Sequence, residues 1–157
     1  MSRPTTDMAK EGLFNILANR YEFTDMKILD LFSGTGSIGY EFISRGAGSV
    51  TFVEKNISHV YFIRKVIRKL GIENAIVLCQ DVFRYLKKCR IKYDIIFCDP
   101  PFNLPELDEI PPVVFKSDIL VENGILIIEH SKDHNFSNTP HFFESRKYGK
   151  VNFSFFS

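Results

Sequence analysis

The residues best suited to chemistry are Asp99-Pro100-Pro101-Phe102, which follow an apolar run at residues 93–98. The run is typical of a buried strand that ends at the acid. The Asp99 carboxylate and the Pro100 carbonyl can each accept a hydrogen bond, and the Phe102 ring can stack. Because proline fixes φ and has no N–H, these carbonyls can face a ligand without a competing turn hydrogen bond. The pattern predicts a rigid cradle for a flat ligand that carries an amino group.

Methyl transfer to an exocyclic amine is the chemistry that this combination favours. Such an amine on a nucleobase is a poor nucleophile, because its lone pair is delocalised into the ring. Hydrogen bonds to Asp99 and the Pro100 carbonyl would turn the lone pair toward a sulfonium methyl group and stabilise the developing positive charge. Alignment of the two reactants supplies much of the remaining rate enhancement. Stacking on Phe102 would hold an extruded base. In isolation, Asp-Pro and Pro-Pro are also compatible with an ordinary turn.

A glycine-rich turn, Asp30-Leu31-Phe32-Ser33-Gly34-Thr35-Gly36, ends a second apolar strand. The carboxyl end of such a strand is where doubly wound folds bind ligands, and the glycines would let the backbone approach one closely. With Gly39, the turn also satisfies the G-x-G-x-x-G pattern, and Glu54 lies at a spacing suited to a ribose. A nucleotide-binding oxidoreductase is therefore an alternative at this point.

Acidic residues follow three successive predicted strands, at Asp30, Glu54 and Asp81. A carboxylate at Asp30 would repel a pyrophosphate at the helix N-terminus but would attract an ammonium group. S-adenosylmethionine has an amino-acid end and no phosphate, its ribose suits bidentate binding by Glu54, and its adenine amine suits Asp81. Each acid alone is equally compatible with a turn cap or an exposed carboxylate. The three together, beside the glycine turn, favour S-adenosylmethionine as the ligand.

Strands and helices are expected to alternate along the chain. The patterns predict helices at residues 7–20, 40–44, 58–70, 82–88 and 112–119, and strands at residues 27–32, 49–54, 75–79, 93–98 and 124–129. Thr5 or Thr6 is expected to cap the first helix. Residues 141–147 and 151–156 alternate around a glycine turn and predict a hairpin. The sequence therefore predicts a single doubly wound, Rossmann-like α/β domain over residues 1–157, with a mostly parallel seven-stranded sheet that ends in an antiparallel hairpin.

Composition narrows the function classes. A chain of 157 residues suits one domain with a sizeable core. No apolar run approaches the roughly 18 residues that span a bilayer, and no signal-peptide pattern starts the chain, so we expect no membrane contact. We also expect a cytoplasmic protein and a monomer. Cys79, Cys89 and Cys98 match no zinc spacing, which predicts no metal. Two of them fall in predicted buried strands, so we expect reduced, structural thiols.

The formal net charge of +1 hides an asymmetry along the chain. Residues 55–92 carry ten lysines and arginines against two acids, whereas residues 94–133 carry nine acids against two lysines. A basic segment can attract a polyanion such as RNA. The same residues at ordinary helix spacing can instead solvate two helix surfaces.

The motifs together resemble the class I S-adenosylmethionine-dependent methyltransferases, and among them the bacterial RsmD-type 16S ribosomal RNA guanine-N2 methyltransferases. The resemblance covers nearly the whole chain. It rests on Arg3-Pro4-Thr5-Thr6-Asp7, Leu13-Phe14-Asn15-Ile16-Leu17, Asp30–Gly36, Ser44-Arg45-Gly46-Ala47, Glu54-Lys55-Asn56 and Asp99–Phe102. The Arg-Pro-Thr-Thr-Asp segment is the part that indicates this subfamily. Family members usually carry a further basic, glycine-containing segment before it, and this chain begins almost on the motif, so weaker RNA capture is expected.

The resemblance implies methyl transfer from S-adenosylmethionine, leaving S-adenosylhomocysteine (SAH), to N2 of a guanine in 16S ribosomal RNA. The RNA partner would be the small ribosomal subunit or its precursor. Adenine N6 or a protein glutamine as acceptor, and a non-catalytic RNA-binding role, are the alternatives. The cofactor-binding residues that the resemblance implies are Asp30, Phe32, Ser33, Gly34, Gly36, Glu54, Lys55, Asp81 and Val82, with Thr5 and Thr6 closing over the site. Asp99, Pro100, Pro101 and Phe102 would receive the guanine, and Arg3, Lys65, Arg68 and Lys69 would contact RNA.

Overall fold

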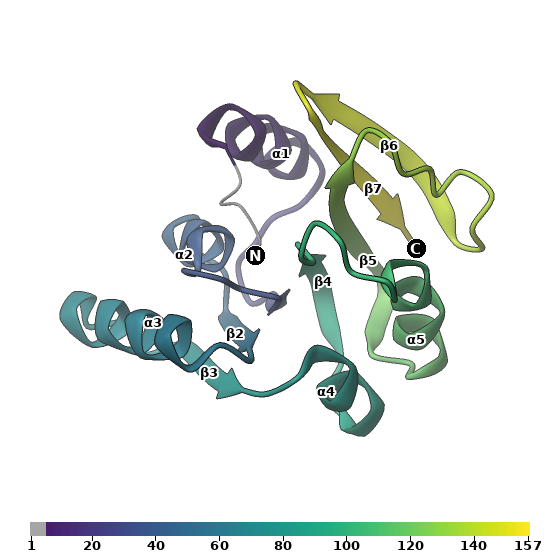
Figure 1. Cartoon of the computed structure of the whole chain (residues 1–157). Coiled ribbons are helices and arrows are strands. Elements are labelled where there is room, and N and C mark those ends of the chain that lie inside the picture. The colour runs from purple at the N-terminus through teal and green to yellow at the C-terminus, as the bar shows by residue number, and fades with distance from the viewer. Residues whose placement is uncertain (1–5) are drawn as a thin grey trace.

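Five parallel strands form the centre of the computed structural model, which describes residues 6–157 (Figure 1). They are β1 (Lys27–Leu31), β2 (Ser49–Glu54), β3 (Ala75–Cys79), β4 (Tyr93–Cys98) and β5 (Leu120–Ser131). The most central of them, β1 and β4, are buried along nearly their whole length because helices cover both faces of the sheet. The order β3-β2-β1-β4-β5-β7-β6 confirms the predicted doubly wound fold with seven strands.

The predicted hairpin is present at the end of the chain. Strands β6 (Phe142–Tyr148) and β7 (Val151–Phe156) pair antiparallel, and β7 also pairs antiparallel with β5. Gly149 in the turn has a φ of 62°, the left-handed conformation that such tight turns require. The hairpin thus extends the parallel sheet at one edge.

Helices cover the two faces of the sheet in separate groups (Figure 1). On one face, α1 (Asp7–Arg20), α2 (Ser37–Ser44) and α3 (Ile57–Leu70) form a core that includes Phe14, Phe42 and Ile63. On the other face, α4 (Val82–Lys88) and α5 (Ile110–Lys116), which follows the 3-10 helix η1 (Leu107–Glu109), form a second core. None of the helices within residues 6–157 is long and apolar enough to cross a membrane.

Several predicted bounds and one burial prediction need correction. The helix predicted at residues 40–44 begins at Ser37. The helix predicted at residues 112–119 begins at Ile110, because its prolines occupy the first turn, where a missing N–H breaks no helical hydrogen bond. The strand predicted at residues 124–129 extends over Leu120–Ser131. The prediction that Cys79 is buried is wrong, because β3 is an edge strand and exposes it, whereas Cys98 in the central strand β4 is buried.

The beginning of α1 is fixed by Thr6, whose hydroxyl accepts a hydrogen bond from the Ala9 backbone N–H at 3.2 Å. This confirms Thr6 as the predicted helix cap. The end of α1 is joined to β6 by two hydrogen bonds between the Arg20 guanidinium and the Glu144 carboxylate, at 2.7 and 3.1 Å. The predicted roles of Arg3 and Thr5 lie outside the described residues.

Candidate active site

The candidate site lies at the carboxyl ends of β1 and β4. These two strands are neighbours in the sheet, and the chain runs outward from them in both directions. Open α/β sheets bind ligands at such a switch point, because the loops there diverge to opposite faces. Strand β1 ends at the glycine-rich turn and β4 ends at Asp99, so the fold brings the two predicted motifs side by side.

The turn after β1 has an unusual backbone that leaves room beside it. Phe32, Gly34 and Gly36 all have positive φ angles, of 56°, 57° and 90°. A left-handed phenylalanine costs about 1–3 kcal/mol, a strain that is found mostly at functional sites. A side chain added at Gly34 would meet no atom within 4 Å among the described residues. The backbone of this turn is therefore open to a ligand.

Glu54 holds this turn against the end of β2. Its Oε1 accepts a hydrogen bond from the Gly34 N–H at 2.7 Å, and its Oε2 accepts one from the Asn56 N–H at 2.9 Å. A carboxylate has about four lone-pair sites, so these two bonds leave acceptor capacity for a pair of ribose hydroxyls. The prediction that Glu54 holds a ribose thus fits a side chain whose orientation is already fixed.

Asp30 is a buried acid, with 2% of its surface exposed. Its Oδ2 accepts a hydrogen bond from the Gly39 N–H at 3.2 Å. Burial, reinforced by the charge of Glu54, raises its pKa to about 8, although hydrogen bonds from Gly39 and Ser33 act in the opposite direction. A cation placed beside Asp30 would favour the ionised carboxylate. The ammonium group of an amino acid would supply such a cation.

Tyr40 is a residue near Asp30 that the sequence analysis missed. Its hydroxyl is buried and has no hydrogen-bond partner within residues 6–157. Burial and the charge of Asp30 raise its pKa to about 12. A buried, unpartnered hydroxyl beside a buried acid and an open glycine turn fits the amino-acid end of S-adenosylmethionine, because that end supplies both donors and acceptors.

The Asp-Pro-Pro-Phe segment forms a turn over the carboxyl end of β4. Asp99 is half-buried, Pro100 is buried, and 76% of the Phe102 surface is exposed. The Asp99 N–H donates to the Leu31 carbonyl at 3.4 Å, which ties the segment to β1. Burial, and then the charges of Glu129 and Asp30, raise the pKa of Asp99 well above its usual range. The acid therefore lies inside the site, while the ring is free to stack on a base.

The segment after β5 is joined to η1, which follows the loop that carries Phe102. His134, after β5, forms a 2.7 Å hydrogen bond with Asp108 in η1, and its ring packs edge-on against Phe136.

Glu129 of β5 was also missed by the sequence analysis, which treated it as part of a buried strand. The available signal was the one used for Asp30 and Asp99, an acid near the end of an apolar run.

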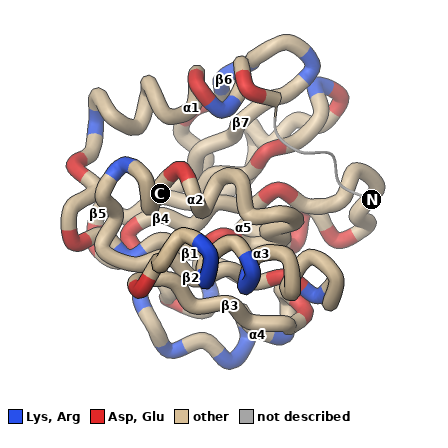
Figure 2. The backbone as a smooth tube through the Cα atoms, turned by 90° about the vertical axis from the view of Figure 1, so that its left-hand side faces the viewer, with Lys and Arg blue, Asp and Glu red and all other residues tan. Residues whose placement is uncertain are grey.

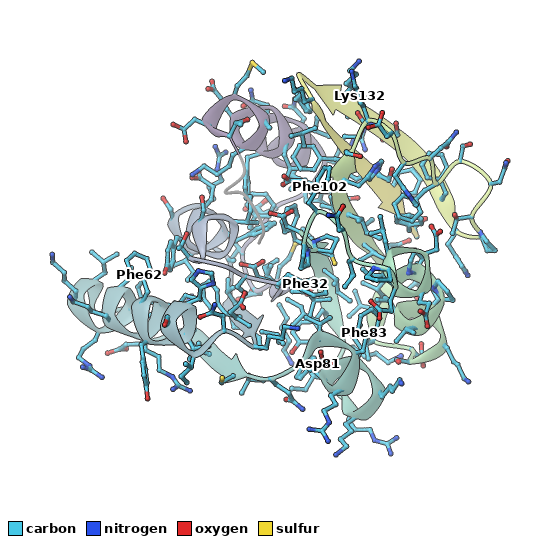
Figure 3. The ribbon with its side chains drawn as sticks, viewed as in Figure 1. Phe32, Phe62, Asp81, Phe83, Phe102 and Lys132 are labelled. Atoms are coloured by element: carbon cyan, nitrogen blue, oxygen red, sulfur yellow. The ribbon has the colours of Figure 1, made fainter. Side chains whose placement is uncertain are left out.

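The end of β3 contributes less clearly to the site. Asp81 caps α4, since its Oδ2 accepts a hydrogen bond from the Arg84 N–H at 3.1 Å, and the Val82 side chain is buried in the second core. Lys55 is exposed. Figure 3 shows Asp81 and Phe83 at the start of α4, on the side of the sheet opposite to α3. The structure thus gives Asp81 the turn-cap role that the sequence left open, and its predicted contact with adenine stays a prediction.

The predicted RNA-binding residues Lys65, Arg68 and Lys69 lie on α3, away from the loop that carries Phe102. All three are exposed, and none forms an ion pair within the described part of the chain. Figure 2 shows basic positions gathered on α3, and Figure 3 places its Phe62 far from Phe102. Arg64 on the same helix instead donates to the Val77 carbonyl of β3 at 3.3 Å. Because α3 packs on β3 and β2, an RNA held by α3 must extend past β1 to reach Asp99 at the end of β4.

Comparisons with known proteins give a consistent result. The family model described as "Conserved hypothetical protein 95" matches residues 1–157. Ribosomal RNA small subunit methyltransferase D of Buchnera aphidicola subsp. Baizongia pistaciae is 37% identical over 138 residues, which are 88% of this chain and 70% of that protein. The structure of a putative methyltransferase from Escherichia coli matches with a TM-score of 0.86 at 27% identity, covering 99% of this chain and 86% of that one. A putative methyltransferase complexed with SAH has the same fold, with a TM-score of 0.76 at 18% identity, covering 97% of this chain and 50% of that one.

Proposed function

Because the chain belongs to the RsmD family, the family described as conserved hypothetical protein 95, we propose that it methylates N2 of a guanine in small-subunit ribosomal RNA. The observation that carries the proposal is the adjacency of the Asp30 turn and Asp99 at the ends of β1 and β4. One set of residues suits a sulfonium cofactor and the other suits an amine. A shared switch point brings the methyl donor and the acceptor together.

The residues of the β1 turn would hold S-adenosylmethionine, which supplies an electrophilic methyl group when bound. Asp30 and Tyr40 suit its amino-acid end, and Glu54 suits its ribose. This assignment agrees with the SAH carried by a protein of the same fold. It disfavours the oxidoreductase alternative, because a pyrophosphate beside Asp30 would keep the acid protonated and gain no ionic partner there, whereas an ammonium group would form an ion pair with the carboxylate.

Asp99 and the Pro100 carbonyl would accept hydrogen bonds from the exocyclic amine, and Phe102 would stack on the base. The exposure of Phe102 supports this role, since a ring that is 76% exposed contributes little to the core. Preorganised acceptors at the amine stabilise the positive charge that develops on it during transfer. The ribosomal RNA substrate is supported by the names of relatives such as the Buchnera aphidicola and Escherichia coli proteins.

A methylation assay tests the proposal. The protein is incubated with S-adenosylmethionine and either free small-subunit ribosomal RNA or assembled small subunits, and the RNA is digested and its nucleosides identified by mass. We expect N2-methylguanosine. N6-methyladenosine would replace the proposed acceptor with another amine, and methyl transfer to ribosomal protein alone, or no transfer to either substrate, would contradict the proposal.

Removing the positive charges of α3 should weaken RNA binding. Replacing Lys65, Arg68 and Lys69 together with alanine should lower affinity for ribosomal RNA and reduce the slope of log affinity against log salt by about 2, at roughly 0.7 per lost phosphate contact on single strands. The affinity for SAH should not change. The control replaces Lys147 and Lys150 of the hairpin, which are also exposed, and the losses of the two variants are compared per charge removed. An equal loss of RNA affinity per charge in both variants would indicate that only the overall charge of the protein matters, and it would exclude a site on α3.

A further inference from the structure

Glu129 is level with Asp99 on the neighbouring strand. In the parallel register of β4 and β5, Cys98 lies opposite Ile128, so Asp99 and Glu129 are the next residues of the two strands. Neighbouring strands are about 4.8 Å apart. The two acids are therefore adjacent at the carboxyl end of the sheet.

Both acids also point to the same face of the sheet. Phe97 and Ile127 contribute to the core beneath α1 and α2, and Asp99 and Glu129 lie two residues beyond them. Side chains two apart along a strand share a face. Glu129 has only 8% of its surface exposed, and its charge raises the pKa of Asp99. The site therefore has two carboxylates side by side on the face where the β1 turn opens.

We infer that Glu129 is the residue that selects guanine, by accepting a hydrogen bond from N1–H of the base whose N2 amine Asp99 holds. This rests on the proposed function. Guanine presents two neighbouring donors on its Watson–Crick edge, N1–H and the N2 amine, which two neighbouring carboxylates match. Adenine presents an acceptor at N1 beside its amine, so its lone pair would face the Glu129 carboxylate. Extruded bases are read through this edge.

Base analogues test this role in the wild-type protein. Synthetic RNA carries the target guanine, or in its place 2-aminopurine, which keeps the N2 amine but has an acceptor at N1. Because a polar site rejects an analogue that leaves its groups unpaired, kcat/KM for guanine should exceed that for 2-aminopurine by about 100-fold or more. RNA containing inosine, which has N1–H and no amine, should also bind more tightly than RNA containing unsubstituted purine. Equal binding of inosine and purine would overturn the inference without any variant.

Substituting Glu129 assigns the discrimination to this residue. In Glu129→Gln the amide can donate to N1 of 2-aminopurine, so the preference for guanine should fall by about tenfold or more. Glu129→Asp should retain the preference, because it keeps the carboxylate. Glu122→Gln, at an exposed position of the same strand, is the matched control. A Glu129→Gln variant that loses activity equally on both bases would show a structural role only. Failure of the wild type to methylate guanine would instead contradict the proposed function.

Discussion

Replacing Asp99 with asparagine should lower kcat for methyl transfer by about 100-fold or more, which is the usual cost of removing one preorganised hydrogen-bond partner of a transition state. Asparagine has nearly the same shape and keeps one acceptor oxygen, but it loses the negative charge that would stabilise the positive charge developing on the amine. The residues at the carboxyl end of β1 are unchanged, so the affinity for SAH should remain close to that of the wild type. Initial rates on ribosomal RNA and calorimetry with SAH measure the two effects separately.

The control for Asp99 lies at the other end of the same strand. Asp94 is at the beginning of β4, where its side chain accepts a hydrogen bond from the Lys27 N–H at 2.8 Å. Asp94→Asn makes the same chemical change far from the site and should retain full activity. If Asp99→Asn also retained it, the amine would have to be held by other groups and the proposed cradle would be wrong.

The pH dependence of the rate should report on Asp99 as well. Its pKa is raised well above the usual range by burial and by the charges of Glu129 and Asp30. Because only the ionised carboxylate is a pure acceptor, kcat/KM should rise as the pH increases through the pKa of Asp99 in the free enzyme. The residual kcat/KM of Asp99→Asn should lack this rise with pH.

Most of the fold followed from local patterns. The bounds of β2, β3 and β4 were predicted correctly, because each is an apolar run with turn residues at both ends. The pattern failed at β5, where Glu122, Asn123 and Gly124 interrupt the apolar residues. There the strand continues because it pairs with β4 through a shift of register between Tyr93 and Ile95, an effect of tertiary pairing that residue type does not reveal.

The residues of the candidate site that could be predicted are those that residue type and position at a strand end are enough to identify. Asp30, Glu54 and Asp99 were identified as acids at strand ends. Tyr40 was not, because the burial of its hydroxyl, which has no partner among residues 6–157, depends on how α2 packs over β2, where its ring contacts Phe52. The basic residues of α3 gave a charge pattern, but that pattern did not reveal the hydrogen bond from Arg64 to the Val77 carbonyl of β3.

Replacing Asp30 with asparagine should make the cofactor-free protein more stable. A pKa of about 8 in the folded protein, against about 3.9 in an unfolded chain, means that the unfolded state releases the proton more readily. Asp30 therefore has little effect on the free energy of unfolding below pH 4, and it lowers that free energy increasingly as the pH rises toward 8. Asparagine keeps an acceptor for the Gly39 N–H and removes the acid. The gain in unfolding free energy should grow over this range to at most about 6 kcal/mol.

Urea unfolding at several pH values measures this gain. The difference between Asp30→Asn and wild type should increase between pH 4 and pH 8 and level off above. Asp133→Asn, at an exposed position, is the matched control. A gain that did not change with pH would mean that Asp30 does not carry its proton in the folded protein.

The same substitution should impair cofactor binding. Hydrogen bonds to charged groups contribute about 1.5–3 kcal/mol, so loss of the Asp30 carboxylate should weaken SAH binding by about tenfold or more. At pH 7 the wild-type acid holds a proton that an ammonium group would displace, so SAH binding should release protons, which calorimetry in buffers of different ionisation enthalpy detects. Asp30→Asn should bind without this release. A variant that is more stable and yet binds less tightly would show that Asp30 is retained for the cofactor at the expense of the fold, whereas unchanged binding would remove Asp30 from the site.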